Sequence, residues 1–409
     1  MKCIVIGGGV SGMFCAGLLA QNGNEVTLIE KNEKLGKKLY ITGKGRCNVT
    51  NDSDRQTVLN NIVSNPKFVM SALSRFTPQD TMAFFEEQNV PLKVERGNRV
   101  FPQSDKSSDI IKALTNFIYD NHVNVLLNTV VQSLIVKEGK AIGVKTNKGE
   151  LFADAVIVAT GGVSYPTTGS TGDGYKWAKA VGHNIIEIRP GLNGLIVKGV
   201  EQLAGLTLKN VEAKIFINDK EEYSEFGEML FTHIGVSGPI ILTLESKINK
   251  NYVKGKFNCS VKLCIDLKPA ISEEELETRL LKDFKAKANV DIKNLMPEYM
   301  PKALIELILS QAKIEKTIKC NSITKEQRQA LIEAIKSLKL KVLDIDKIEN
   351  AIITSGGIDV KDISPKDMQS KLVKDLYFIG EVLDIDALTG GFNIQLALST
   401  AYAMANSVL

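Results

Sequence analysis

The first thirty residues alternate between short apolar runs and polar turns. Cys3-Ile4-Val5-Ile6 predicts a buried strand, residues 13–21 predict a helix, and residues 25–30 predict a second strand. Between the first strand and the helix lies the glycine-rich turn Gly7-Gly8-Gly9-Val10-Ser11-Gly12. The order strand, helix, strand indicates that the chain opens with a βαβ unit.

Farther along the chain the pattern changes twice. Helices are expected near residues 66–74 and 79–88, and short strands follow them up to the apolar run 155–159, which is typical of a parallel sheet covered on both faces. Beyond residue 190, alternating strands predict an antiparallel or barrel-like unit, and amphipathic helices come after it. The expected strands are 211–217, 229–232, 260–267, 338–343, 351–354 and 376–379, and the expected helices are 273–284, 301–311, 325–337 and 391–407.

The composition is that of a large globular protein. The 409 residues, of which 44% are hydrophobic, predict about two to three domains, each with its own core. Fifty-one Lys and Arg against 47 Asp and Glu leave a formal charge of +4, which argues against a nucleic-acid partner.

The six cysteines are scattered and form no CxxC pair, so we expect neither a disulfide framework nor a metal site, and a reducing cytoplasm suits them. The glycines of residues 7–12 interrupt the N-terminal apolar stretch, and no run approaches the roughly 18 apolar residues that span a bilayer. We therefore expect a cytoplasmic protein that does not associate with a membrane.

The glycine-rich turn has the GxGxxG spacing in the context that binds a dinucleotide. Gly7 permits the tight turn, Gly9 lets a pyrophosphate approach the backbone, and Gly12 lets the helix pack on the strand. Val10 and Ser11 begin the helix, whose N-terminus would supply amide donors and partial positive charge. The pattern is that of a phosphate-binding turn.

An acidic residue completes the dinucleotide pattern. Glu30, followed by Lys31, ends the second strand, where a carboxylate accepts hydrogen bonds from the adenosine ribose and repels a 2′-phosphate. The alternative is a glycine-rich turn without a ligand. Because strand, helix and terminal Glu are in register, we predict a dinucleotide site.

Three further features favour FAD over NAD. The run 155–159 continues into Thr160-Gly161, and flavoproteins with two dinucleotide-binding domains use such an Ala-Thr-Gly turn beside FAD. The last strand runs into Gly380-Glu381, where those flavoproteins place an acidic residue, usually Asp, against the ribitol, so Glu381 or Asp384 would take that role. Gly391-Phe392-Asn393-Ile394 opens the last helix, whose N-terminus would point at the flavin edge that becomes negative on reduction.

Five stretches together resemble one bacterial flavoprotein family. They are residues 37–51 (KKLYITGKGRCNVTN), 99–102 (RVFP), 169–174 (GSTGDG), 231–239 (FTHIGVSGP) and 380–384 (GEVLD). The family contains NAD(P)- and FAD-dependent oxidoreductases, among them aminoacetone oxidase-like and bile-acid Δ4,6-reductase-like flavoproteins. The resemblance covers nearly the whole chain.

The resemblance implies an α/β fold. A Rossmann-like FAD-binding domain, of the type with two dinucleotide-binding domains, would carry an inserted β-barrel and a helical subdomain. The FAD-binding domain would comprise residues 1–190 and 355–409, the barrel 191–270 and 336–354, and the helical insert 271–335. The strands and helices expected from the pattern agree with this division, and we expect the insertion to select the substrate.

Further candidate residues lie outside the glycine turn. The loop after Glu30 is basic, and its cations would offset the charge of the cofactor unless the loop is simply solvated. The cofactor-binding candidates in this loop are Lys37, Lys38, Gly45, Arg46, Cys47 and Asn48. Val131, in a later strand, is a further candidate. Cys47 lacks a second cysteine for a dithiol relay, so we interpret it as a small residue packed near the cofactor. The catalytic candidates are His233, Tyr165 and Arg46, with a structural role as the alternative for His233.

These features predict an enzyme whose bound FAD passes a hydride between NAD(P)H and a small organic substrate, for instance a C=C bond next to a carbonyl. An O2-dependent oxidase of amines or amino ketones is a second hypothesis. A flavin-dependent RNA-binding or RNA-modifying protein is a third, and the near-neutral charge argues against it. The sequence specifies no oligomeric state.

Overall fold

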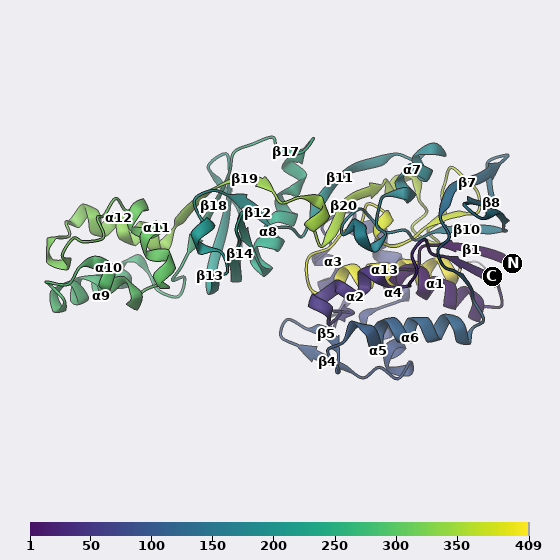
Figure 1. Ribbon diagram of the computed structural model, residues 1–409, viewed down its shortest axis with the longest axis horizontal. Helices are drawn as coiled ribbons and strands as arrows, with labels where there is room; N and C mark the ends of the chain where they lie inside the picture. Colours follow the sequence, from purple (N-terminus) through teal and green to yellow (C-terminus); the bar gives the residue numbers. More distant parts are fainter. Residues whose placement is uncertain (408–409) are drawn as a thin grey trace. The chain divides into compact units, whose positions relative to one another are not determined.

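The computed structural model describes residues 1–407, which form two compact units (Figure 1). Unit 1 comprises Met1–Gly191 and the chain from Lys347 onward, and unit 2 comprises Leu192–Asp346. The family resemblance implied that the chain returns to the first unit near residue 355. It returns eight residues earlier, because β20 (Ile353–Ile358) pairs with β11 (Ile185–Gly191) inside unit 1.

A five-stranded parallel sheet forms the centre of unit 1. Its order is β21 (Leu376–Phe378), β10 (Ala155–Val158), β1 (Lys2–Ile6), β2 (Glu25–Ile29) and β6 (Asn124–Leu126). Every neighbouring pair is parallel. All residues of β10 and all but the first of β1 are buried, which explains why these strands are apolar without alternation.

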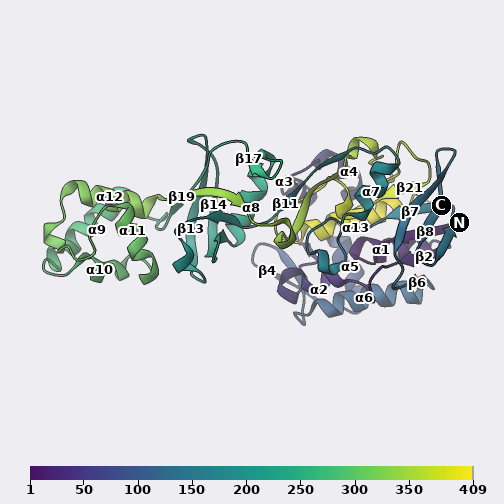
Figure 2. The same ribbon diagram turned by 45° about the horizontal axis from the view of Figure 1, so that its top comes forward.

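Helices from opposite ends of the chain pack together in unit 1. α1 (Val10–Gln21) contacts α13 (Phe392–Ala405), and the two lie side by side in Figure 2. Most residues of both helices are buried, so neither has a polar face. α6 (Ser107–Asp120), which the pattern did not predict, also packs on α1. The other helices of this unit are α2 (Lys37–Ile41), α3 (Arg55–Asn60), α4 (Pro66–Arg75), α5 (Pro78–Glu87) and α7 (Asp173–Ala180).

Small antiparallel sheets complete unit 1. One has the order β3-β5-β4 and another the order β7-β8-β9. Their strands are β3 (Thr50–Asn51), β4 (Leu92–Glu95), β5 (Arg99–Pro102), β7 (Val131–Lys137), β8 (Lys140–Thr146) and β9 (Gly149–Phe152). Together with the parallel sheet they confirm the predicted Rossmann-like domain.

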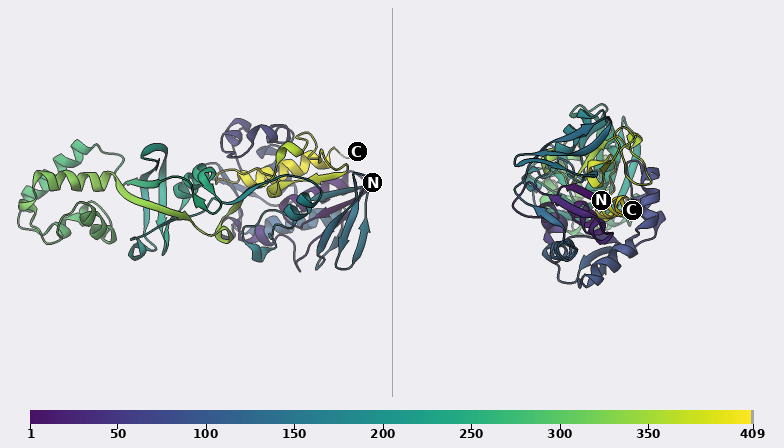
Figure 3. Two further views of the ribbon diagram at one scale, coloured as in Figure 1. Left: turned by 90° about the horizontal axis from the view of Figure 1, so that it is seen from above. Right: turned by 90° about the vertical axis from the view of Figure 1, so that its right-hand side faces the viewer.

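Unit 2 contains a closed six-stranded barrel and a group of helices, which Figure 3 shows beside the barrel strands. The barrel order is β12 (Leu195–Val197), β15 (Gly235–Ser237), β14 (Lys220–Phe231), β13 (Thr207–Ile217), β18 (Val261–Asp266) and β19 (Leu338–Ile345). The helices are α8 (Pro239–Ile248), α9 (Glu273–Ala286), α10 (Ile292–Leu295), α11 (Ile305–Gln311) and α12 (Lys325–Lys336), and β16 (Tyr252–Val253) pairs with β17 (Lys256–Phe257). The barrel confirms the predicted fold class. Among residues 1–407, no helix has the length and apolar character of a transmembrane span.

One buried side chain ties α13 to its surroundings. Gln395 Oε1 accepts hydrogen bonds from Thr50 Oγ1 at 2.6 Å and Thr81 Oγ1 at 2.7 Å. Its Nε2 donates to the Phe76 carbonyl at 3.1 Å and to Ser399 Oγ at 3.0 Å. Gln395 has no exposed surface, so these partners replace water completely.

We predict that Gln395→Ala lowers the free energy of unfolding of unit 1 by about 2 to 4 kcal/mol, because buried polar groups lose their partners. Trp177 is the only tryptophan and lies buried in unit 1, so its fluorescence during urea unfolding reports on this unit. The exposed Gln21 provides the control Gln21→Ala, which should change the free energy by less than about 0.5 kcal/mol. Equal effects of the two substitutions would contradict the structural role of Gln395.

Candidate functional site

The glycine turn lies where β1 ends and α1 begins. Gly7 has φ +110° and donates its N–H to the Ile29 carbonyl at 2.8 Å. A Cβ on Gly12 would lie 1.9 Å from the Gly7 carbonyl oxygen, whereas a Cβ on Gly9 would meet nothing within 4 Å. Packing therefore requires glycine at positions 7 and 12, and Gly9 leaves open space before the helix.

The N-terminus of α1 is uncapped and lies against the turn after β21. Gly9 is its N-cap, no side chain in the described part of the chain caps it, and its first turn, with Val10 and Ser11, holds no acidic residue. A Cβ on Gly380 would lie 2.7 Å from Ser11 Oγ, and the Gly380 N–H donates to Thr400 Oγ1 of α13 at 3.1 Å. Free amides at a helix start bind phosphate groups.

Glu30 holds the glycine turn from the end of β2. Its Oε2 accepts the Gly8 N–H at 2.8 Å, and its Oε1 accepts the Asn32 N–H at 2.8 Å and the Asn32 amide at 2.7 Å. A carboxylate with these partners keeps lone pairs for ribose hydroxyls. The Thr129 N–H donates to the Glu30 carbonyl at 3.1 Å, which brings the buried Val131 to the same end of the sheet.

The Ala-Thr-Gly turn touches the glycine turn. A Cβ on Gly7 would lie 2.5 Å from the Ala159 carbonyl oxygen, so the two backbones are in contact. Gly161 has φ +68°, which favours glycine. The buried Thr160 hydroxyl has no hydrogen-bond partner within residues 1–407 and lies beside Gly174 of α7.

Lys38 and Glu381, which the sequence predicted to meet FAD, bind each other. Lys38 Nζ lies 2.7 and 2.9 Å from the two Glu381 carboxylate oxygens and donates to Ser164 Oγ at 2.7 Å. The Thr354 N–H donates to Glu381 Oε1 at 2.9 Å. The two side chains are 21% and 22% exposed, so the pair retains an open edge that can meet ribitol hydroxyls.

Two other basic candidates have acidic neighbours. Lys31 Nζ lies 2.8 Å from Asp173 Oδ2, and this cation lowers the pKa of Asp173 against the effect of burial. Lys37 Nζ lies 3.5 Å from Glu33 Oε2 at the surface. Both ammonium groups therefore bind carboxylates, and neither of these contacts involves the glycine turn.

Arg46 ties its loop to β4, β5 and the turn after them. It forms ion pairs with Glu95 and Asp105, and its guanidinium lies 4.1 Å above the Phe101 ring. Hydrogen bonding from Arg46 lowers the pKa of Glu95, and hydrogen bonds from Lys93 and then Arg46 lower that of Asp105. These partners fix Arg46 to β4, β5 and the turn after them, and its expected catalytic role stays a prediction.

The end of this loop contains strained backbone and an unpartnered amide. Gly45 has φ +84° and Cys47 has φ +58°. Cys47 is fully buried, and burial raises the pKa of its thiol to about 12, so it stays protonated near neutral pH. Asn48 Oδ1 is buried without a hydrogen-bond partner in the described residues, which leaves an acceptor for a ligand.

Two aspartates before α13 are buried. Asp384 Oδ2 accepts a hydrogen bond from the Asn65 side-chain amide at 2.8 Å, and burial raises the pKa of Asp384. This candidate for the ribitol contact therefore already has one protein partner. Asp386 is 1% exposed, and burial raises its pKa to about 6. Its Oδ1 lies 3.5 Å from Ser355 Oγ, and its Oδ2 has no hydrogen-bond partner among residues 1–407. The sequence did not point to Asp386 because its surroundings come from distant segments.

The N-terminus of α13 is shaped by packing. Gly391 has φ +96°, and a Cβ there would lie 2.3 Å from the Thr50 carbonyl oxygen. Asn393 Oδ1 accepts the Ala387 N–H at 2.9 Å, and its Nδ2 donates to the Ala387 carbonyl at 2.7 Å. No side chain of the described chain caps this helix. The flanking residues Phe392 and Ile394 are buried and half-buried.

The remaining catalytic candidates differ in their surroundings. His233 is exposed in the turn between β14 and β15 of unit 2, and Gly235 beside it is required by the barrel, since a Cβ would lie 2.1 Å from the Leu195 carbonyl oxygen. Tyr165 is half-buried in unit 1 with φ +51°. It follows Ser164, which contacts the Lys38 ammonium, so Tyr165 adjoins the predicted cofactor residues.

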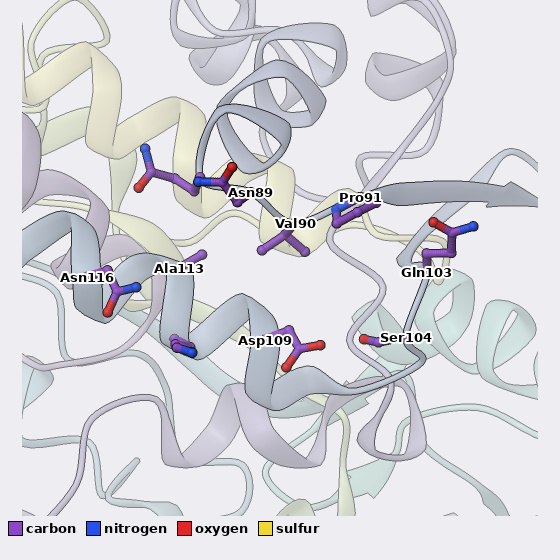
Figure 4. Close-up of a pocket in the computed structure, with 10 residues that line it drawn as sticks. Asn89, Val90, Pro91, Gln103, Ser104, Asp109, Ala113 and Asn116 are labelled. Carbon is purple, nitrogen blue, oxygen red and sulfur yellow. The ribbon is translucent and has the colours of Figure 1, made fainter.

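A surface pocket of about 500 Å³ lies elsewhere in unit 1, between α5, α6 and the turn after β5 (Figure 4). Asn89, Gln103, Asp109 and Asn116 contribute its polar lining. No residue predicted to bind cofactor or substrate lines it. Within residues 1–407, no group of three His, Cys, Asp or Glu side chains is placed to bind a metal.

The features of unit 1 fit FAD. Two uncapped helix N-termini, those of α1 and α13, offer free amides to pyrophosphate and flavin. Glu30 suits the adenosine ribose, and Asn48 has an unused acceptor. FAD has phosphates, hydroxyls and a polar ring, which are the kinds of group that these residues can bind.

Comparison with known proteins agrees with this fit. The profile of the family described as HI0933-like protein Rossmann domain matches residues 1–407. Ribosomal RNA dihydrouridine synthases of Escherichia coli (strain K12) and Haemophilus influenzae are 30% and 32% identical, over 99% of this chain and 97% and 98% of theirs. The 3-dehydro-bile acid delta(4,6)-reductase of Clostridium scindens is 27% identical over 97% of this chain and 96% of that protein.

Two solved steroid enzymes share the fold. The 3-ketosteroid delta1-dehydrogenase of Sterolibacterium denitrificans superposes with a TM-score of 0.52 at 13% identity and covers 99% of both chains. The 3-ketosteroid-delta4-(5alpha)-dehydrogenase of Rhodococcus jostii RHA1 gives 0.51 at 12% identity, over 99% of this chain and 97% of that one. At such identities the similarity concerns the fold alone.

We predict that Glu30→Ala weakens FAD binding about tenfold or more, because a charge-assisted ribose contact of roughly 1.5 to 3 kcal/mol is lost. The substitution also frees the Gly8 N–H, which adds disorder to the phosphate-binding turn. Flavin fluorescence during titration of apoprotein with FAD measures the dissociation constant. Glu33→Ala, on the same loop but exposed, is the control, and equal affinities of both variants would contradict the assignment of Glu30.

We predict that Asp386 makes unit 1 less stable as the pH rises. Burial raises its pKa from 3.8 to about 6, so folding favours the protonated carboxyl, and this stabilisation is present below about pH 4 and lost as the pH rises through 6. At 1.36 kcal/mol per pKa unit the change is at most about 3 kcal/mol.

Asp386→Asn remains neutral, so it should match the parent near pH 4 and exceed it in stability above pH 7. Urea unfolding followed by Trp177 fluorescence at both pH values measures the difference. The exposed Asp52 supplies the control Asp52→Asn. A stability difference between Asp386→Asn and the parent that does not vary with pH would show that the carboxyl is not buried as the structure has it.

Proposed function

The chain belongs to the HI0933-like Rossmann-domain family and is an FAD-dependent oxidoreductase, and from this we propose that it reduces the carbon–carbon double bond of uracil in ribosomal RNA. The observation that carries the proposal is the full-length similarity to two ribosomal RNA dihydrouridine synthases. The FAD-compatible residues of unit 1 support it, since a flavin is the group that such a reduction needs.

The names of the relatives describe one type of chemistry. Dihydrouridine is uridine whose base has lost its C=C bond, and that bond is conjugated to a ring carbonyl. A delta(4,6)-reductase of 3-dehydro-bile acids saturates double bonds conjugated to a keto group. In both cases a hydride adds to a carbon that the carbonyl makes electrophilic, and a proton adds to a second carbon. The predicted reduction of a C=C bond next to a carbonyl is therefore common to both substrates.

The proposed RNA substrate differs from our expectation of no nucleic-acid partner. That expectation rested on the formal charge of +4, which is a sum over the whole chain. RNA binding depends on where cations gather on the surface, and a near-neutral protein can carry a basic patch. The identities of 30% and 32% to the RNA enzymes, against 27% to the bile-acid enzyme, favour RNA over a steroid.

The residues of this chain would divide the work as follows. The amides of α1 and Glu30 hold the adenosine diphosphate part of FAD, and the Lys38 and Glu381 pair orients the ribitol. When bound, FAD supplies the hydride, and we assign NAD(P)H as the reductant that renews it. The Tyr165 hydroxyl donates the proton to the base carbon next to the carbonyl and regains one from solvent.

The test is anaerobic reoxidation of the reduced holoenzyme. We expect uridine-containing ribosomal RNA to restore the absorbance of oxidised flavin and to gain two hydrogen atoms per modified base, measured by mass spectrometry of the nucleosides. RNA whose target uridine is already dihydrouridine is the control and should leave the flavin reduced. Reoxidation by a conjugated keto steroid but not by RNA would contradict the RNA substrate, and rapid turnover of amino ketones in air would favour an oxidase.

We predict that Tyr165→Phe slows reoxidation of the flavin by the RNA substrate roughly 100-fold, because this half-reaction adds a proton to the base. NAD(P)H should reduce the flavin at the parent rate, because that half-reaction does not need the Tyr165 proton. Tyr119→Phe is the control, since Tyr119 is 53% exposed and lies on α6. Stopped-flow absorbance separates the two half-reactions. If both half-reactions of Tyr165→Phe keep the parent rates, Tyr165 is not the proton donor.

A further inference from the structure

Lysines are frequent in two segments of the helical part of unit 2, residues 285–293 at the end of α9 and the start of α10, and residues 313–319 after α11. Figure 1 labels these helices. We call this group of lysines the lysine patch. Its members come from residues 285–293 and 313–319 and are Lys285, Lys287, Lys293, Lys313, Lys316 and Lys319. Four of them are exposed, and Lys287 and Lys293 are half-buried.

The fold brings the two segments of the patch together. They run antiparallel, with a bridge between Asp291 and Lys319. The Ile292 N–H donates to the Ile318 carbonyl at 2.9 Å, and the Lys293 N–H donates to the Lys316 carbonyl at 3.4 Å. Lysines more than twenty positions apart in sequence therefore lie on adjacent segments of the chain.

Carboxylates neutralise only part of the patch. Lys319 Nζ lies 2.7 Å from Asp291 Oδ1, and Lys287 forms an ion pair with Glu298. Lys319, and more weakly Lys293, lower the pKa of Asp291, which shows that both cations are close to this carboxylate. The two segments hold one further carboxylate, that of the exposed Glu315.

Four lysines of the patch form no ion pair in the described part of the chain, although Lys293 acts on Asp291 at longer range. Within residues 1–407, no ion pair involves Lys285, Lys293, Lys313 or Lys316. Like charges on adjacent segments repel each other. This repulsion lowers the free energy of unfolding when no anion is bound. A bound anion would relieve that repulsion.

Most lysines of the barrel strands have a carboxylate partner. The pairs are Lys214 with Glu212 and Glu221, Lys220 with Glu222, Lys262 with Asp219, and Lys339 with Glu333. Among residues 1–407, the exposed Lys209 of β13 and Lys341 of β19 form no ion pair. The lysine patch differs from these two in that its members lie on two segments joined by backbone hydrogen bonds.

We propose that the lysine patch binds the phosphate backbone of the RNA substrate, an inference that rests on the proposed function. Ammonium groups on flexible side chains suit phosphates at varied positions, and they supply affinity without reading sequence. The site of reduction and the patch would then divide the recognition of RNA between the cofactor-binding unit and the insertion.

The test is RNA binding by the oxidised holoenzyme, in which no reduction takes place. The variant Lys293→Ala/Lys316→Ala removes two cations that form no ion pair within residues 1–407. We expect several-fold weaker binding at low salt and a plot of log K against log salt whose slope is smaller in magnitude by about 1.4 to 1.8, since each lost phosphate contact removes about 0.7 to 0.9. Flavin absorbance and thermal unfolding should match the parent.

The control is Lys145→Ala/Lys179→Ala, which makes the same change in charge at exposed positions of β8 and α7 in unit 1. It should bind RNA as the parent does, and Lys293→Arg/Lys316→Arg should retain binding. Equal affinity and equal salt slope of the two alanine variants would overturn the proposal. So would competition by polyglutamate as strong as that by RNA at equal charge concentration, because the patch would then bind any polyanion.

The two proposals fail separately. If the parent makes dihydrouridine and the patch variant binds RNA normally, the surface is wrong and the proposed function stands. If the patch variant loses RNA binding but the parent reduces no uridine in bound RNA, the surface stands and the proposed reaction is wrong.

Discussion

Backbone contact around the start of α1 is the constraint on which unit 1 depends. Gly12 meets the carbonyl of Gly7, Gly7 meets that of Ala159, and Gly380 meets Ser11, so that a Cβ on any of these glycines would lie between 1.9 and 2.7 Å from its neighbour. Three strand ends of the parallel sheet can converge there only without side chains. The same absence of side chains leaves the helix amides open to a phosphate.

Most charged side chains that we predicted to bind the cofactor already have partners within unit 1. Glu30 binds the glycine turn, Lys38 binds Glu381, and Arg46 binds carboxylates of its own subdomain. The groups that stay open to an anionic cofactor are therefore mainly the amides at two helix N-termini, whose partial charges need no counter-ion and do not change with pH. Asp386 is the exception, because its burial places its proton equilibrium near pH 6.

Net charge and charge placement give different answers about partners. The total of +4 predicts no polyanion, yet two adjacent segments in the helical part of unit 2 together hold six lysines and only two carboxylates, those of Asp291 and Glu315. A conjugated carbonyl is reduced by the same chemistry in a nucleobase and in a steroid. Substrate choice in such a family then depends on surfaces outside the cofactor site, which can change without disturbing the packing around α1.

The sequence by itself determined the βαβ unit, the glycine turn, Glu30 and the barrel as a separate unit, because these follow from residues close together in the chain and from the period of the apolar positions. Only the tertiary structure assigned β20 to unit 1, gave Lys38 and Arg46 their carboxylate partners, and buried Asp386. It also brought residues 287–293 beside 316–319. Ion pairs and strand partners are selected by proximity and burial across long stretches of sequence, and no local pattern encodes which distant side chain will be there.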